Sequence, residues 1–206
     1  MIEKLLHDFL IIWATIDPIG TMALFAGLTA KLSAEARRKT AFKTIAYASA
    51  VLLGSIVIGQ VLLSAMGISL LSFQLAGGII LFLFGLQMIF STGNDHDEGS
   101  ESSKHDIAVF PLAIPSTATP GAILAVILLT DNYTHPVVEQ VTTALIMLVV
   151  LAITLVMMLL SGHILRVIGT GGASILVRLM GMVLAALSVE FVMEALGVAN
   201  WIQQAG

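Results

Sequence analysis

The segment "ATIDPIGTMA", residues 14–23, lies inside an apolar stretch long enough to cross a bilayer. It places Asp17, Pro18 and Gly20 at the depth where a membrane helix is normally uninterrupted. Proline removes a backbone donor and clashes with the preceding turn, and it pushes the residue before it out of the helical region. The segment therefore predicts a helix that breaks in mid-membrane, which is stable only where protein or a water-filled cavity surrounds the break.

The composition is that of an integral membrane protein. Of the 206 residues, 58% are hydrophobic and 11% are charged, whereas a soluble domain has about a quarter of its residues charged. The absence of cysteine excludes disulfides, thiolate metal sites and thiol redox chemistry. The chain has a net charge of −4 and no basic face, which argues against a nucleic-acid partner. The N-terminal segment lacks a small-residue cleavage site, so we expect a retained helix rather than a signal peptide.

Six segments are apolar enough to span a membrane, which takes about 20 residues. Between the third and the fourth, residues 92–106 form an acidic, polar linker that we expect to be cytoplasmic. Its two histidines, His96 and His105, are weak metal-site candidates, and we expect no metal site in the chain. The six predicted spans are Leu5–Leu28, Thr44–Met66, Ser72–Phe90, Ile107–Thr130, Val137–Ser161 and Ser174–Leu196.

The basic residues predict the orientation of these spans. Cytoplasmic loops of membrane proteins carry an excess of Lys and Arg. If the six spans are correct, eight basic residues fall on one side and only Lys4 on the other. Both termini are therefore expected on the outer side. The eight residues are Lys31, Arg37, Arg38, Lys39, Lys43, Lys104, Arg166 and Arg178.

A weak internal repeat relates the two halves of the chain. "FQLAGGIILFLFGLQMIF" (73–90) resembles "VRLMGMVLAALSVEFVMEAL" (177–196), with Gly77 aligned to Gly181. "DPIG" in the first span likewise resembles "TPGA" in the fourth, with a similar offset along the chain. Three spans are an odd number, so the second half enters the membrane from the opposite side. An inverted-topology repeat of this kind is typical of secondary transporters.

The repeat and the prolines together predict the fold. We expect an all-α integral membrane protein with six transmembrane helices in two inverted three-helix repeats, residues 1–91 and 107–206. Pro111, Pro115 and Pro120 should interrupt the fourth helix as Pro18 interrupts the first. Asp17 and Thr119 are suitable caps for the half-helices that follow. The four predicted half-helices are Leu5–Thr15, Pro18–Ala30, Ile107–Ile114 and Pro120–Thr130.

The two breaks predict a binding site at the bilayer midplane. Helix N-termini offer amides and a positive dipole end to a carboxylate, and free carbonyls at the preceding C-termini suit an ammonium group or a sodium ion. A small zwitterion matches both, and small residues at the breaks leave little room for a large side chain. The predicted substrate-binding residues are Asp17, Pro18, Ile19, Gly20, Thr21, Ser116, Thr117, Ala118, Thr119, Pro120, Gly121 and Ala122.

Several of these features have simpler interpretations. Asp17 is alternatively a helix cap satisfied by its own backbone. Glu190, expected to be buried within the last span, is a candidate with Asp17 for binding a coupling ion or proton, or alternatively pairs with Gln87. Gly77, Gly78 and Gly85 of the third span, and Gly181 of the last, are expected to form close-packing helix faces.

Four motifs carry a family resemblance: "DPIGTMALFAGLT" (17–29), "AGGIILFLFGLQMIF" (76–90), "PLAIPSTATPGAI" (111–123) and "RLMGMVLAALSVEFVMEAL" (178–196). They resemble those of the MarC family (UPF0056) of bacterial and archaeal inner-membrane proteins. The resemblance covers nearly the whole chain except the acidic linker. The family usually has Asn where this chain has Thr21, and Gly where it has Thr119, and both changes fall at the predicted site.

The resemblance implies six helices in two inverted triplets, and transport of small neutral amino acids, glycine and alanine above all, as in characterised archaeal members. We therefore expect a secondary transporter in the bacterial or archaeal inner membrane, coupled to Na⁺ or H⁺ or running as an exporter. Export of another small solute and a purely structural membrane role are the alternatives. No enzyme motif lies at membrane depth, so we expect no catalysis, no cofactor, and no partner beyond the amino acid and the lipid bilayer; the oligomeric state is not predicted.

Overall fold

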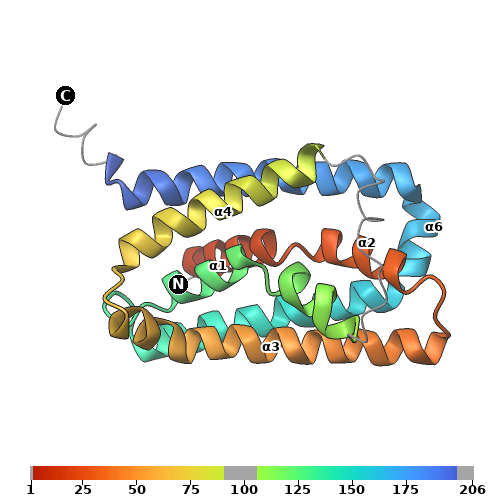
Figure 1. Ribbon diagram of the computed structural model, residues 1–206, viewed down its shortest axis with the longest axis horizontal. Helices are drawn as coiled ribbons and strands as arrows, with labels where there is room; N and C mark the ends of the chain where they lie inside the picture. The colour runs from red at the N-terminus through yellow and green to blue at the C-terminus, as the bar shows by residue number, and fades with distance from the viewer. Residues whose placement is uncertain (1, 91–105, 199–206) are drawn as a thin grey trace.

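The protein is built from helices throughout the part of the chain that the structure describes, residues 2–90 and 106–198 (Figure 1). This computed structural model leaves the predicted acidic linker, with His96 and His105, outside the described residues except for Asp106. Across residues 2–90 and 106–198, no group of three His, Cys, Asp or Glu residues is placed to hold a metal ion. The elements are α1 (Ile2–Ile16), α2 (Pro18–Leu28), α3 (Ala34–Ala65), α4 (Leu70–Phe90), η2 (Ala108–Thr117), α5 (Pro120–Leu129) and α6 (Val137–Ala195).

The helices are long and apolar enough to cross a membrane. Five helical segments in the described residues pass that test, and a sixth span results if η2 and α5, bent by 54° at their junction, are counted together. The prediction of an all-helical integral membrane protein is therefore confirmed. The five segments are Ile2–Leu28, Ala34–Ala65, Leu70–Phe90, Val137–Gly169 and Gly171–Ala195.

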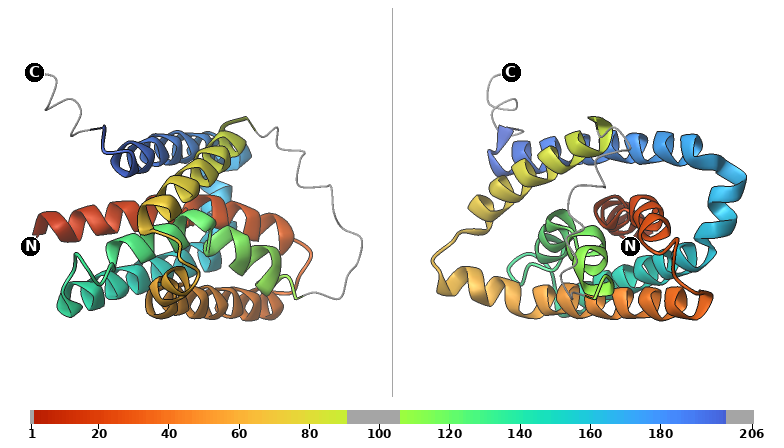
Figure 2. Two further views of the ribbon diagram at one scale, coloured as in Figure 1. Left: turned by 60° about the vertical axis from the view of Figure 1, so that its left-hand side comes forward. Right: turned by 45° about the vertical axis from the view of Figure 1, so that its right-hand side comes forward.

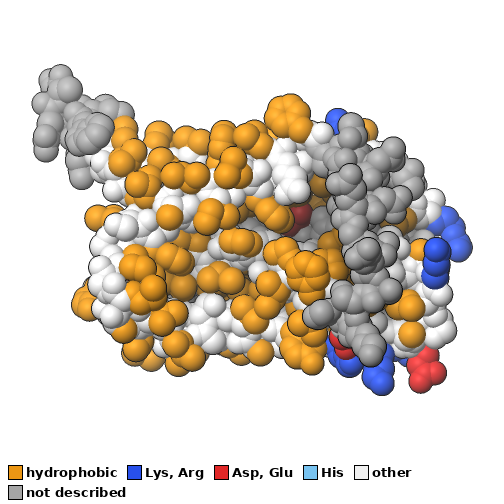
Figure 3. Space-filling view, in the orientation of Figure 1, with side chains coloured by type: hydrophobic (Ala, Val, Ile, Leu, Met, Phe, Trp, Pro, Cys, Tyr) orange, Lys and Arg blue, Asp and Glu red, His pale blue; other side chains and the backbone are white. Residues whose placement is uncertain are grey.

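Successive spans run in opposite directions along the long axis of the molecule. α1 begins and α6 ends at the left-hand end in Figure 1, whereas α2 ends and η2 begins near the right-hand end. Lys and Arg side chains gather at the right-hand end of the face drawn in Figure 3, and hydrophobic side chains are spread over the left and centre of that face.

Two predicted boundaries were wrong. α3 begins at Ala34, ten residues before the predicted Thr44, because the Ser33 hydroxyl caps the Ala36 amide at 3.2 Å and starts the helix early. Most of the basic residues assigned to the first loop therefore lie on a helix. The predicted loop between the last two spans is absent from the described residues, where α6 is interrupted only at Gly169, whose φ of 73° an L side chain rarely adopts.

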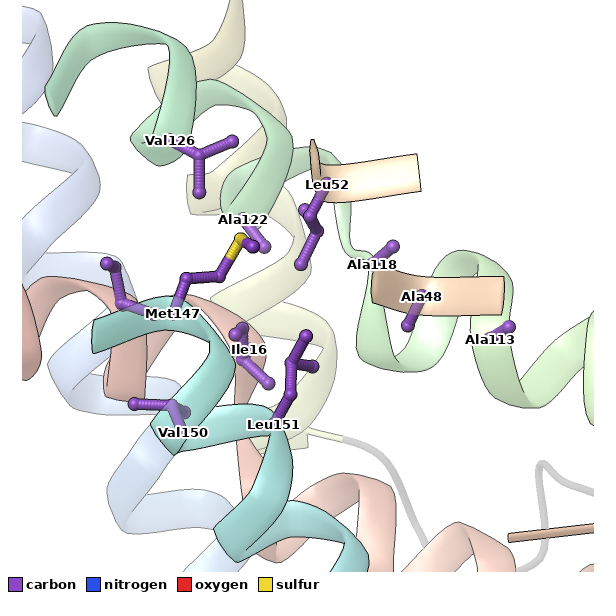
Figure 4. Packing of buried hydrophobic residues seen from close by; sticks show 11 residues of the cluster. Ile16, Ala48, Leu52, Ala113, Ala118, Ala122, Val126, Met147, Val150 and Leu151 are labelled. Atoms are coloured by element: carbon purple, nitrogen blue, oxygen red, sulfur yellow. The ribbon is translucent and has the colours of Figure 1, made fainter. Parts of the chain in front are cut away.

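The interrupted helices lie in the middle of the molecule. α1, α2, η2 and α5 lie between α4 with the last part of α6 on one side, and α3 with the first part of α6 on the other (Figure 2). The main buried cluster joins the interruptions to this surround, with Ile16, Ala118 and Ala122 packed near Leu52 and Leu151 (Figure 4). Protein therefore covers most of both breaks, which is the condition for non-helical backbone at membrane depth.

α4 and the last part of α6 approach backbone to backbone. A Cβ atom at Gly85 would lie 2.8 Å from the Gly181 carbonyl oxygen, and a Cβ atom at Gly181 would lie 2.8 Å from the Gly85 carbonyl oxygen. A Cβ atom at Gly78 would lie 3.2 Å from the Ser188 carbonyl oxygen. The predicted close-packing faces are confirmed, because only glycine allows this approach.

We expect Gly85→Val to destabilise the protein by about 1–3 kcal/mol, because the new side chain meets backbone that cannot move aside. Thermal unfolding in detergent measures the loss as a lower midpoint. Gly54→Ala is the matched control, since a Cβ atom at Gly54 of α3 would meet nothing within 4 Å. Equal midpoints for the two variants would contradict the close approach of α4 and α6.

Candidate functional site

The first interruption is a single residue, Asp17, between α1 and α2. Its backbone is left-handed, with φ 49° and ψ 72°, a conformation that Asp tolerates better than most residues. Pro18 has no N–H, so the carbonyl of Ala14 loses its helical donor. The Asp17 carboxylate accepts a hydrogen bond from the Gly20 amide at 3.1 Å and is only 5% exposed. Asp17 is therefore the buried cap of α2, and its carboxylate would collide with a Cβ atom at Gly20.

The second interruption has the same cap at the equivalent position. The Thr119 hydroxyl accepts a hydrogen bond from the Ala122 amide at 2.8 Å, as Asp17 does from Gly20, and both members of the pair lie 102 residues further along the chain. Thr119 differs in having an extended backbone, with φ −67° and ψ 156°. The segment before it is less regular than α1, because Phe110 and Ile114, each before a proline, leave the helical region.

Hydroxyl groups join each interruption to the other. The Thr21 hydroxyl donates to the Ser116 carbonyl at 3.0 Å, and the Thr119 hydroxyl donates to the Thr15 carbonyl at 2.7 Å. The Ser116 carbonyl needs this donor because Pro120, four residues on, has no N–H. The Thr21 and Ser116 hydroxyl oxygens also lie 3.3 Å apart. Each break therefore supplies a polar group that the other break lacks.

The structure buries most of the twelve residues predicted to bind substrate. Eight are buried, three are partly exposed, and Pro120 is exposed. Thr117 is buried but its hydroxyl bonds the Leu112 carbonyl of its own segment, at 2.8 Å. The buried residues are Asp17, Pro18, Thr21, Thr117, Ala118, Thr119, Gly121 and Ala122, and the partly exposed ones are Ile19, Gly20 and Ser116.

Peptide groups predicted to be free at the breaks are in use. The Gly20 and Ala122 amides bond the caps of their own helices, and the Thr15 and Ser116 carbonyls accept hydroxyls from the opposite break. An unpaired polar group in an apolar surround costs several kcal/mol, roughly 2–7, so the folded chain pairs them internally. The cap interpretation of Asp17 is thus the one its contacts support in this arrangement.

The prediction of Glu190 as a second buried acid was wrong. Glu190 is exposed on α6, about one and a half turns before the helix ends. The polar contact between α4 and this part of α6 is made instead by Gln74, whose amide donates to Glu194 at 3.0 Å and to the Phe191 carbonyl at 3.2 Å. Ser188 and Phe191 occupy the buried face of α6, which turns Glu190 away from the protein.

Sequence reasoning missed a contact near the basic end of the molecule. Arg37 of α3 donates to the buried Ser161 hydroxyl of α6 at 2.8 Å, and its guanidinium lies 5.7 Å from the ring centroid of Phe25 in α2. The charge count assigned Arg37 to a loop, so nothing in the pattern predicted that it joins three helices. A second omission, Asp8 of α1, is only 1% exposed and bonds the Thr143 hydroxyl.

These features define an integral membrane protein in which two interrupted helices are enclosed by the others and bonded to each other. The chain belongs to the MarC family: the sequence profile described as "MarC family integral membrane protein" matches residues 2–201. This confirms the resemblance and, with the apolar helices, a multi-pass protein of the inner membrane.

Curated relatives cover most of the chain. The "UPF0056 inner membrane protein MarC" of Citrobacter koseri is 32% identical over 192 residues, 86% of this chain and 87% of the relative. The protein of the same name from Salmonella typhimurium is 31% identical over the same shares. A "UPF0056 membrane protein" of Buchnera aphidicola is 29% identical over 98% of this chain and 99% of its own length. No solved structure matches the chain.

We expect Thr119→Val to lower the free energy of unfolding by about 2 kcal/mol, since it leaves the Ala122 amide and the Thr15 carbonyl unpaired in a buried site. Thr142→Val is the matched control, because the Thr142 hydroxyl bonds only the Val138 carbonyl of its own helix. Thermal unfolding in detergent compares the two. If Thr119→Val unfolds at the same temperature as the control, the bonds between the breaks do not hold the fold.

Proposed function

We propose that this protein is a secondary transporter of small neutral amino acids, of the size of glycine or alanine. The observation that carries the proposal is the pair of hydroxyl-to-carbonyl bonds between the two breaks, Thr21 with Ser116 and Thr119 with Thr15. Such bonds hold polar groups together at membrane depth and can be exchanged for bonds to a polar ligand at little net cost.

A zwitterion offers the groups needed for this exchange. Its carboxylate takes the place of the Thr119 hydroxyl at the Ala122 amide, at the N-terminus of α5, where the helix dipole favours an anion. Its ammonium group takes the place of the two threonine hydroxyls at the Thr15 and Ser116 carbonyls. The Asp17 carboxylate, which is buried at the first break, balances the positive charge.

Packing around the breaks favours a small substrate. A Cβ atom at Gly121 would collide with the Leu81 side chain, and Ala118 and Ala122 are each only 1% exposed. A ligand between the breaks therefore has room for a hydrogen or a methyl group as its side chain, unless the helices move much further apart.

An inverted repeat supplies the movement. Two observations support it: the caps of α2 and α5 are equivalent at a constant offset of 102 residues, and the chain enters the second triplet from the opposite end of the molecule (Figure 1). Movement of one triplet against the other would open the breaks to each side in turn.

The basic end of the molecule is assigned to the cytoplasm by the positive-inside rule, which leaves both termini outside. The coupling ion is H⁺ or Na⁺.

Counterflow in proteoliposomes tests the proposal. Vesicles loaded with unlabelled glycine or alanine should accumulate the labelled amino acid, and Asp17→Asn and Thr21→Val should each reduce the rate at least tenfold. Thr142→Val should behave like the wild type, because the Thr142 hydroxyl bonds only the Val138 carbonyl of its own helix and contacts neither break.

The contrary outcomes are distinct. Counterflow of another small polar solute, without that of any amino acid, would replace the substrate and retain a transporter. No counterflow of any solute by stably folded protein would favour the structural alternative. Unchanged rates in both variants would remove the breaks from the transport pathway.

A further inference from the structure

Asp8, in the first half of α1, is a buried acid outside the site described above. It is 1% exposed, and one carboxylate oxygen, Oδ2, accepts a hydrogen bond from the Thr143 hydroxyl of α6 at 2.6 Å. The other, Oδ1, is buried and accepts no hydrogen bond. A buried carboxylate oxygen without a partner is unfavourable while the group is charged, so this oxygen is placed to take up a cation.

Two nitrogen atoms of α1 lie close to this carboxylate. The imidazole Nδ1 of His7 is 3.6 Å from Oδ1, slightly beyond hydrogen-bonding distance, and the side chain of His7 is 65% exposed. The ammonium group of Lys4 is 3.8 Å from Oδ2. The exposed imidazole thus lies on the surface of the protein, next to the buried, unpartnered oxygen.

The remaining charged groups lie in the first turn of α6 and just before it. Glu139 lies 3.3 Å from the Lys4 ammonium group, and His135 lies 3.2 Å from Glu139. α5 packs against this side of α1 through apolar residues, with Leu124 and Ala125 beside Ile11. Asp8 is therefore the buried member of a cluster whose other ionisable groups, Lys4, His7, His135 and Glu139, are more exposed.

We infer that Asp8 is a proton-binding site loaded from the outer aqueous phase through His7. In this step an imidazolium N–H bond of His7 breaks and an O–H bond forms at Asp8 Oδ1, which leaves a neutral imidazole and a neutral carboxylic acid. A hydronium ion of the outer aqueous phase then reprotonates the imidazole and becomes a water molecule. A hard metal cation is less suited to the position, because such ions take six or more oxygen ligands, whereas nitrogen atoms of Lys4 and His7 adjoin Asp8.

The location gives the proton an effect on transport, and this part rests on the proposed function. Asp8 is in the first triplet and Thr143 in the second, so their hydrogen bond crosses between the parts that would move. Loss of the negative charge weakens the attraction of Lys4 and alters the bond to Thr143. Asp8 lies in α1, nine residues before Asp17, the residue that follows the end of this helix, and about 13 Å from it along the helix axis. A change at Asp8 is therefore carried by α1 directly to the first break.

Separate measurements of exchange and of driven uptake test this inference. We expect Asp8→Asn to keep amino-acid counterflow within twofold of the wild type while losing at least tenfold of the accumulation driven by an inward proton gradient. His7→Gln, at an exposed position, should slow driven uptake several-fold and leave counterflow unchanged. Thr143→Val keeps the acid and removes the hydrogen bond between the two triplets, so it should lower driven uptake and leave counterflow unchanged.

A spectroscopic measurement separates this inference from the proposed function. On acidification, infrared difference spectra of the purified wild type should contain a carboxylic-acid C=O band that Asp8→Asn lacks and Thr143→Val retains. If the wild type moves no amino acid but has this band, the transport proposal fails and the proton site stands. The inference is overturned if the band persists in Asp8→Asn, if both Asp8→Asn and His7→Gln keep proton-driven accumulation, or if only a sodium gradient drives uptake.

Discussion

The requirement that buried peptide groups be hydrogen-bonded governs this structure. Two spans contain prolines that remove donors at membrane depth, and no water is available in the hydrocarbon region to replace them. The chain meets the requirement by placing the two interruptions against each other, so that the Thr21 hydroxyl serves the Ser116 carbonyl and the Thr119 hydroxyl serves the Thr15 carbonyl. Neither break would be stable alone, which is why the two halves of the chain depend on each other.

The contacts between the halves are of two kinds. At Gly85 and Gly181 the backbones of α4 and α6 touch, and any side chain would separate them. At the breaks, and between Asp8 and Thr143, single hydroxyl groups make the connection. Such hydrogen bonds contribute only about 0.5–1.5 kcal/mol each, so they can be exchanged with a ligand or with water, whereas the glycine contact has no such substitute.

The sequence predicts the class of the protein and the place of its interruptions, because hydropathy and proline act locally. It also predicts the close-packing glycines, since the absence of a side chain is visible in the pattern. It does not predict where α3 begins, or that α6 runs through the loop expected between the last two spans and is interrupted only at Gly169 within the described residues. It also does not predict that Glu190 is exposed, or that Glu194 accepts a hydrogen bond from Gln74. Those features depend on which face of a helix meets its neighbour, and neighbours are set by the whole fold.

The candidate site divides in the same way. The residues at the breaks follow from the spacing of proline, acid and threonine, whereas their partners do not. Thr21 meets Ser116 across 95 residues of sequence, and Thr119 meets Thr15 across 104. The burial of Asp8 was missed for a related reason: a charged residue one turn after Lys4 at the start of an apolar helix resembles an interfacial residue, and only the packing of α6 against α1 buries it.

The most direct test of the central claim uses the absence of native cysteine. The hydroxyl oxygens of Thr21 and Ser116 are 3.3 Å apart, within the reach of a disulfide between these positions. In membranes treated with a mild oxidant, the double variant Thr21→Cys with Ser116→Cys should form an intramolecular disulfide, detected by mass spectrometry, while a pair of Thr21→Cys with Thr142→Cys should not. Failure of the first pair to cross-link, with both thiols reactive after unfolding, would contradict the meeting of the two breaks.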